Sequence, residues 1–191
     1  HEQACVMAAH GYYMQSGRMA AVLVTAGAGT TNALTGVVGA WADSVPVLII
    51  SGQESTKQFK GNNLARMIGI QGVYAESIYC SCTKSVVTCQ SPERVISELA
   101  AAAHFARADR PGPCMVDIPI DLQAAKLDAG IVDNLVAEAK SYTQSSFSGV
   151  SQEAIAALIT AINKSEAPLL WLGNGLRRLP GAELRSMIEA L

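Results

Sequence analysis

The chain has 191 residues, of which 50% are hydrophobic and 16% charged, and its formal net charge at pH 7 is −2. This apolar content is ample for a packed core and excludes a wholly disordered chain. The small charge gives no global attraction for nucleic acid or acidic membranes, and no apolar run approaches the ~20 residues of a membrane-spanning helix. We therefore predict a soluble, cytoplasmic globular protein with no nucleic acid or membrane partner, long enough for one domain and part of another.

The chain begins with His1 and shows no leader-like pattern, so we interpret it as a piece of a longer polypeptide. Its five cysteines predict reduced, mostly buried thiols, because a chain of this length needs no disulfides. Cys80 and Cys82 form a Cys-x-Cys pair, but no second ligand pair and no nearby His accompany it. We predict no metal site in these residues.

Apolar runs alternate with helical patterns along the first two thirds of the chain. In chain order we predict helix Glu2–Gln15, strand Ala20–Thr25, helix Thr30–Ala42, strand Val45–Ser51, strand Val86–Thr88, helix Pro92–Arg107 and strand Cys114–Ile118. The strands are short and almost uninterruptedly apolar, which is typical of strands buried on both faces of a parallel sheet. This order predicts an α/β fold, a doubly wound parallel sheet with helices on both faces.

A second unit follows the predicted sheet. We assign residues 1–128 to the first domain and residues 129–150, which end in a Ser-rich stretch, to a linker. Residues 151–191 then read as helix Gln152–Asn163, strand Leu169–Leu172, a Gly-Asn-Gly turn and helix Gly181–Leu191. A single helix-strand-helix unit cannot bury a sheet, so we interpret it as the incomplete start of a second α/β domain.

The first strand runs into a Gly-x-Gly turn, Gly27-Ala28-Gly29, at the start of a helix. Such a turn brings backbone N–H groups and a helix N-terminus close to a ligand. Asn32 stands where the dinucleotide fingerprint needs a third Gly, and the Gly-Lys-Ser/Thr of a P-loop is missing. On pattern alone, a tight turn without a ligand is an equal alternative. Similarly, Glu2 alone would be only a favourable partner of the helix dipole.

Several sequence blocks gain meaning when they are taken together. They are His1–Gln3, Thr25–Asn32, Asp43–Pro46 with Ile50–Gln53, Gly69–Gln71, Thr83–Lys84, and Arg110–Pro113 with Val116–Pro119. In this order they resemble the N-terminal pyrimidine-binding domain of thiamine diphosphate-dependent enzymes, closest to the acetolactate synthase-like branch. Residues 165–177 resemble the opening of that family's central domain. The resemblance implies that the domain's first strand and helix, most of the central domain and the diphosphate-binding domain are missing.

The resemblance implies a catalytic role for Glu2. In this family a Glu hydrogen-bonds N1′ of the cofactor's aminopyrimidine ring. A carboxyl group in an apolar pocket has a raised pKa, so we expect Glu2 to keep a proton that it shares with the ring. The activated cofactor then attacks a 2-oxo acid, and its thiazolium ring takes up electrons as CO₂ leaves.

Other site residues are implied by the same resemblance. Those expected to bind the cofactor are Thr25, Gly27, Ala28, Gly29, Asn32 and Gln71. Lys84 matches a Lys near the substrate channel in some relatives, with a solvated surface Lys as the equal alternative. Two positions depart from the pattern. Ala28 stands where most relatives have Pro, and Gly72 stands where acetolactate synthases usually have an acidic residue, which leaves room for other 2-oxo acids.

The resemblance also implies partners and cofactors. The cofactor would lie between the pyrimidine domain of one subunit and the diphosphate-binding domain of another, so we expect a homodimer or homotetramer. Mg²⁺ would be bound through the missing C-terminal domain, and FAD is a further candidate cofactor. We therefore predict part of an enzyme that decarboxylates a 2-oxo acid and transfers its acyl group, with the fragment itself inactive. The alternative is a non-catalytic nucleotide- or flavin-binding or interaction module.

Overall fold

The computed structural model describes residues 1–59, 66–141, 150–169, 171–178 and 181–189. The chain divides into two compact units, His1–Ser145 and Ser146–Leu191. Within the described ranges, no helix combines the length and apolarity that crossing a membrane requires.

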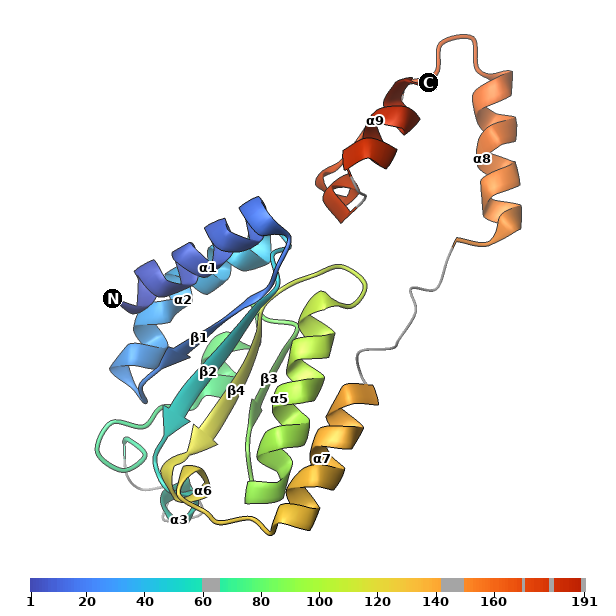
Figure 1. Ribbon diagram of the computed structural model, residues 1–191. Helices are drawn as coiled ribbons and strands as arrows, with labels where there is room; N and C mark the ends of the chain where they lie inside the picture. Colours follow the sequence, from blue (N-terminus) through green and yellow to red (C-terminus); the bar gives the residue numbers. More distant parts are fainter. Residues whose placement is uncertain (60–65, 142–149, 170, 179–180, 190–191) are drawn as a thin grey trace. The chain divides into compact units, whose positions relative to one another are not determined.

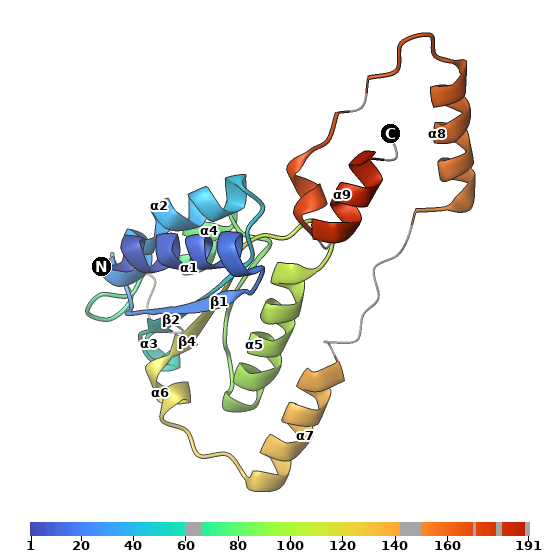
Figure 2. The same cartoon turned by 45° about the horizontal axis from the view of Figure 1, so that its top comes forward.

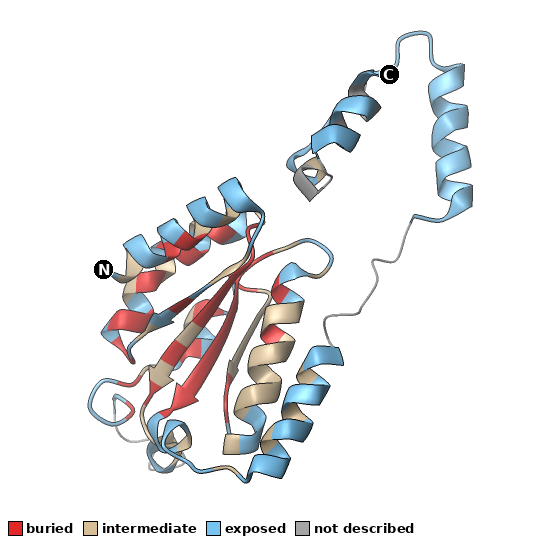
Figure 3. Cartoon of the chain, viewed as in Figure 1, coloured by how far each residue is buried: buried red, intermediate tan, exposed pale blue. Residues whose placement is uncertain are grey.

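The first unit is built on a four-stranded parallel sheet with the order β1-β2-β4-β3 (Figure 1). Its strands are β1 (Ala20–Val24), β2 (Val47–Gln53), β3 (Ser85–Thr88) and β4 (Cys114–Pro119). In the central register, Val22 lies opposite Ile49, and Ile50 lies opposite Val116. The two central strands, β2 and β4, are buried along most of their length (Figure 3), as expected when both faces of a parallel sheet are covered.

Three helices cover one face of this sheet: α1 (Glu2–Ser16), α2 (Ala28–Ala42) and α4 (Ala75–Tyr79). Their apolar side chains form one core with alternate residues of the strands, such as Ile49 and Met115. Helices α1 and α2 lie side by side (Figure 2), and a Cβ on Gly36 would stand only 2.6 Å from the Cβ of Val6. This close approach fixes α1 against α2.

Helix α5 (Pro92–Arg107) covers the opposite face, where Ala102 and Ala106 pack against Leu48 and Val116 of the sheet. Helices on both faces confirm the predicted doubly wound α/β fold. Two short helices, α3 (Thr56–Phe59) and α6 (Ile120–Gln123), follow the carboxyl ends of β2 and β4.

The structure differs from the sequence-based expectation in the range predicted as a linker. Residues 129–150 begin with α7 (Ala129–Ser141), a helix that packs against α5 (Figure 2). The apolar residues that give α7 its one-sided character are partly exposed, for example Ile131 and Val136. The sequence does carry a helical pattern there, with Ile131 and Val132 followed by Leu135 and Val136, and the linker interpretation missed it.

The second unit contains α8 (Gln152–Lys164), the 3₁₀ helix η2 (Asn174–Arg178) and α9 (Gly181–Glu189). Helix α8 begins where the pattern predicts, and the Ser151 hydroxyl caps it by accepting from the Ala154 N–H at 3.2 Å. The predicted strand Leu169–Leu172 includes residue 170, which lies outside the described residues, and its other members are not in a strand. A strand needs a hydrogen-bonded neighbour, and the described part of this unit supplies none.

Candidate functional site

The first turns of α1 and α2 meet through Glu2 and Asn32. The Asn32 amide Nδ2 donates a hydrogen bond to Oε2 of Glu2 at 2.6 Å. This bond, together with the backbone N–H of Glu2 itself, lowers the pKa of the half-buried Glu2 carboxyl. The direction is opposite to the raised pKa that we expect from the sequence. Hydrogen-bond donation outweighs desolvation here, because the carboxyl lies at a partly open surface rather than in a closed apolar pocket.

The Gly-x-Gly turn lies beside this carboxylate. A Cβ on Gly29 would stand 2.6 Å from Cγ2 of Thr25 and 3.5 Å from Oε1 of Glu2, so glycine lets the turn pack closely between Thr25 and the carboxylate. The turn is held by the Thr30 hydroxyl, which donates to the Thr25 carbonyl at 2.9 Å. Ala28, the middle residue of the Gly-x-Gly turn, is the first residue of α2, and its side chain is exposed.

Gln71 reaches the same turn from a distant part of the chain. Gly27 has a φ of 66°, and a Cβ on it would stand 1.9 Å from the Gln71 carbonyl oxygen. No residue other than glycine fits this contact without displacing the loop. The structure thus brings Glu2 and Asn32, the Thr25–Gly29 turn and Gln71 to one end of the sheet.

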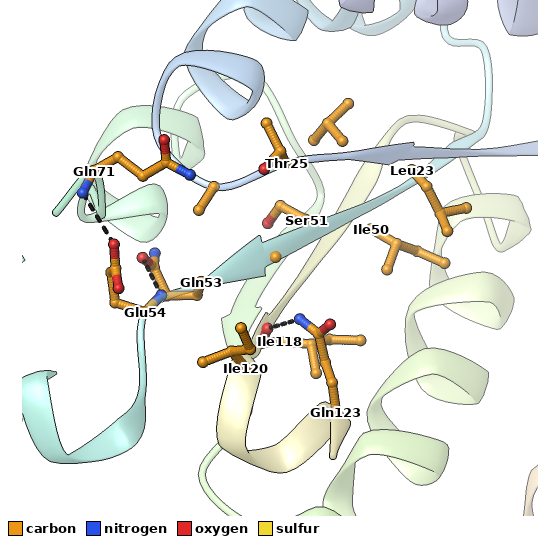
Figure 4. A pocket seen from close by; sticks show the side chains of 13 residues that line it. Leu23, Thr25, Ile50, Ser51, Gln53, Glu54, Gln71, Ile118, Ile120 and Gln123 are labelled. Carbon is orange, nitrogen blue, oxygen red and sulfur yellow. Dashed lines mark hydrogen bonds between the residues drawn. The ribbon is translucent and has the colours of Figure 1, made fainter. Parts of the chain in front are cut away.

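A cavity of about 430 Å³ opens next to this turn, at the carboxyl ends of β1, β2 and β4 (Figure 4). Open α/β sheets bind ligands at this edge. Thr25 and Gln71 line the cavity together with Leu23, Ile50, Ile118 and Ile120 and with the polar side chains of Ser51, Gln53, Glu54 and Gln123. Sequence reasoning assigned no role to these four polar residues. Ser51 and Gln53 lie at the carboxyl end of β2, Glu54 follows that strand directly, and Gln123 lies in α6 after β4. Their place near the carboxyl ends of these strands is the signal that could have found them.

A buried acid supports the polar side of the cavity. Asp117 is fully buried and accepts hydrogen bonds from the Ser51 hydroxyl and, at 2.7 Å, from Nε2 of Gln53. Burial raises the pKa of Asp117 to about 6, although these two hydrogen bonds oppose the shift. Sequence reasoning missed this network, because a strand residue such as Asp117 carries no sign of which partners face it.

Lys84 lies outside this assembly. It precedes β3 at the amino end of the strand, whereas the cavity lies at the carboxyl ends of its neighbours. Its Nζ donates to the carbonyls of Phe105 and Ala108, each at 2.6 Å, at the end of α5, and it lies 5.1 Å from the centre of the Phe105 ring. These contacts give Lys84 the role of a helix cap and offer no support for a place in the substrate channel.

The remaining sequence candidates lie apart from the site. Among the described residues, no three His, Cys, Asp or Glu side chains are grouped so that they could hold a metal ion. All five cysteines are free thiols, and Cys82, Cys89 and Cys114 are buried. His10 packs against α2 with its Nε2 3.2 Å from Oδ2 of Asp43.

The fold and this edge define a class: a parallel α/β domain that presents a helix-borne carboxylate and a glycine turn beside a cavity at the ends of its strands. Comparison with known proteins identifies the family. Residues 1–77 match the family model described as the thiamine pyrophosphate enzyme, N-terminal TPP binding domain. The chain belongs to the thiamine diphosphate-dependent enzymes, in the acetolactate synthase-like branch.

Individual relatives support this assignment. The chain is 35% identical over 177 residues to the acetolactate synthase large subunit of Haemophilus influenzae, covering 92% of this chain and 29% of that protein. It is 32% identical over 182 residues to the mitochondrial acetolactate synthase catalytic subunit of Saccharomyces cerevisiae, covering 92% of this chain and 25% of that protein. The chain therefore spans less than a third of the length of these relatives.

A solved structure shares the fold. The Rhodococcus jostii RHA1 thiamine diphosphate-dependent 4-hydroxybenzoylformate decarboxylase superimposes with a TM-score of 0.75 at 23% sequence identity. The match covers 92% of this chain and 32% of that one. At this identity the similarity establishes the architecture alone.

Proposed function

We propose that this chain supplies the aminopyrimidine-binding part of a thiamine diphosphate-dependent active site, in an enzyme that decarboxylates a 2-oxo acid and transfers the acyl group to an acceptor. The observation that carries the proposal is the hydrogen bond of 2.6 Å between Glu2 and Asn32 beside the bare Gly29. The names of the acetolactate synthase relatives favour this enzyme over a non-catalytic nucleotide- or flavin-binding module.

The residues at this edge fit an aminopyrimidine ring. Gly29 lets the glycine turn pack within van der Waals distance of Oε1 of Glu2, so the turn and the carboxylate would border the same flat ring. A carboxylate can accept a proton and return it, which is the exchange that the ring nitrogen N1′ requires. Thiamine diphosphate, when bound, supplies the carbanion chemistry and the electron sink for decarboxylation.

Three side chains have separate tasks in this proposal. Glu2 holds a proton against the ring nitrogen, and Asn32 fixes the carboxylate orientation by its hydrogen bond to Oε2. Asn32 also favours the ionised form of Glu2, since it lowers the carboxyl pKa. A bound ring would desolvate the Glu2 carboxyl and raise its pKa again, which favours a proton shared between Glu2 and the ring nitrogen. Gln71 faces the adjacent cavity, where the reacting end of the substrate would lie.

Further features belong to the same proposal. The diphosphate and Mg²⁺ would be held by a domain other than this one, with FAD as a further candidate cofactor. The enzyme would act as a homodimer or homotetramer in the cytoplasm, with a small 2-oxo acid as substrate, and residues 1–191 would have no activity alone.

The decisive experiment replaces the proton-exchanging group in the complete protein. Glu2→Gln keeps the shape of the side chain and its acceptor for Asn32 but removes the titrating proton, so we expect kcat to fall by at least about 10²-fold. The matched control is Glu93→Gln, because Glu93 is also a first-turn carboxylate, at the start of α5. Assays contain thiamine diphosphate, Mg²⁺ and pyruvate or a longer 2-oxo acid. A Glu2→Gln variant that keeps most of its kcat would contradict the proposal.

A further inference from the structure

The loop that carries Gln71 is held in place by a carboxylate from the end of β2. Oε1 of Glu54 accepts two backbone hydrogen bonds, from the N–H of Ile70 at 3.0 Å and from the N–H of Gln71 at 2.9 Å. Figure 4 shows the bond to Gln71 and both side chains at the rim of the cavity. An ionised acceptor makes such bonds stronger than a neutral one.

The backbone of the loop is shaped to receive this carboxylate. Gly69 has a φ of 59°, and a Cβ on it would stand 2.6 Å from the carboxyl carbon of Glu54. The Gly72 N–H donates to the Ile68 carbonyl at 2.8 Å and closes the turn around the two donated amides. Gln53, next to Glu54, adds a bond from its Nε2 to the Val73 carbonyl at 2.8 Å.

The other side of the loop touches the glycine turn of the proposed cofactor site. The Gln71 carbonyl packs against Gly27, where a Cβ would be only 1.9 Å from its oxygen. Gln71 is therefore fixed between Glu54 on one side and Gly27 on the other, although its side chain is exposed in the cavity. Loss of the Glu54 contacts would free the loop to move by the small distances to which reacting groups are sensitive.

From these contacts we infer that Glu54 is a positioning residue, which acts through the Ile68–Gly72 turn to set the place of the Gln71 side chain at the reacting end of the site. The inference rests on the proposed function for the role of Gln71. The anchoring of the loop by Glu54 rests on the contacts alone.

The anchoring is tested by amide hydrogen exchange on the full chain. Glu54→Ala should raise the exchange rates of the Ile70 and Gln71 amides by about tenfold, because both lose their acceptor. Glu54→Gln retains an acceptor oxygen of equal reach and should keep most of the protection. The matched control is Asp121→Ala, since Asp121 also accepts a backbone N–H, that of Thr56 at 3.0 Å, without touching this loop. Unchanged exchange at both amides in Glu54→Ala would overturn the inference.

The functional part is tested in the complete protein with thiamine diphosphate, Mg²⁺ and pyruvate. If Glu54 acts through Gln71, Glu54→Ala and Gln71→Ala should each lower kcat/KM about tenfold or more, and the double variant should be no worse than the single ones. If the double variant instead loses kcat/KM by the product of the two single losses, Glu54 acts independently of Gln71, and this outcome would overturn the inference. A protein without any thiamine diphosphate-dependent turnover would contradict the proposed function instead, while the exchange measurement would still decide the anchoring.

Discussion

Asn32 and Glu2 are 30 residues apart in the chain, and their side chains meet at 2.6 Å where α1 and α2 begin. The bond links the two helix starts, so the orientation of the carboxylate depends on how α1 packs against α2. A second side-chain bond links the same two helices nearby, where Nε2 of Gln3 donates to Oγ1 of Thr35 at 3.0 Å. The proposed proton-exchanging group is thus oriented by the interface between the two helices.

Removal of Asn32 should raise the pKa of Glu2. The Asn32 amide is the largest cause of the lowered pKa, and Asn32→Ala deletes it without adding a charge. The measurement is an NMR titration of the Glu2 side-chain carboxyl carbon in both proteins. Thr35→Ala is the control, because it removes the neighbouring bond between the same two helices and should leave the Glu2 titration in place. An unchanged pKa in Asn32→Ala would show that the bond does not persist in solution.

The contact between α1 and α2 predicts opposite effects for two glycines of α2. Gly36→Ala would place a Cβ 2.6 Å from the buried Val6 and should destabilise the protein by about 1–3 kcal/mol through overpacking. Gly39→Ala meets no atom within 4 Å and should stabilise it by about 0.5–1 kcal/mol, because alanine favours the helix. Urea unfolding of both variants measures these changes. Equal effects of the two substitutions would mean that the helices do not pack as closely as described.

The two central strands could be predicted from the sequence because both of their faces are covered. Val47–Gln53 and Cys114–Pro119 are buried along most of their length and are mostly apolar, and this signal is local. The edge strand Ala20–Val24 is also apolar in sequence, although Ala21 and Leu23 are exposed in it. Helix α7 gives the opposite case, since its apolar residues recur at helical intervals but the helix adjoins a Ser-rich stretch and falls within the predicted linker. The pattern also misses helix α4, because it spans only Ala75–Tyr79 and is held by the burial of Tyr79 rather than by helical periodicity.

The candidate site could be predicted in part for a similar reason. Glu2 and the Gly27–Gly29 turn lie in short blocks that resemble a known family, and the structure brings them together with Gln71. The supporting residues could not be predicted in this way. The partners of Asp117 and Glu54 lie far along the chain, up to 66 residues away for Ser51, so only the fold reveals them. Lys84 matches the family pattern in sequence, but in the structure its ammonium group bonds the end of α5, at the amino end of β3 and away from the cavity.

Asp117 should make the protein less stable as the pH rises through the range from about 4 to about 6. Its folded pKa of about 6 is above the ordinary value of 3.8, so the folded protein holds this proton more tightly than the unfolded chain does. The stability contribution is complete below pH 4 and is lost as the pH rises through 6. Asp117→Asn removes the titration, and its Oδ1 can accept from Nε2 of Gln53 while its Nδ2 donates to the Ser51 hydroxyl. The difference in unfolding free energy between the native protein and this variant should fall by on the order of 2 kcal/mol across the range.

The control for this titration has the opposite sign. Hydrogen bonds from Thr56 lower the pKa of Asp121, so Asp121 stabilises the protein above its ordinary pKa and loses that effect as the pH falls. The difference in unfolding free energy between the native protein and Asp121→Asn should therefore grow with rising pH. The corresponding difference for Asp117→Asn should shrink. Chemical unfolding at a series of pH values measures both. A flat difference for Asp117→Asn would contradict the buried, partly protonated acid.

Lys84 should contribute to stability rather than to substrate binding. The last carbonyls of a helix lack partners within the helix, and the Lys84 ammonium satisfies those of Phe105 and Ala108 at the end of α5. Lys84→Met keeps the aliphatic stem that covers Gly112 but loses both bonds, so the free energy of unfolding should fall by about 1–3 kcal/mol. Replacement of the exposed Lys126 by Met is the control and should change it by less than about 0.5 kcal/mol. In the complete protein, Lys84→Met should leave the KM for the 2-oxo acid unchanged. A raised KM with unaltered stability would instead return Lys84 to the substrate channel.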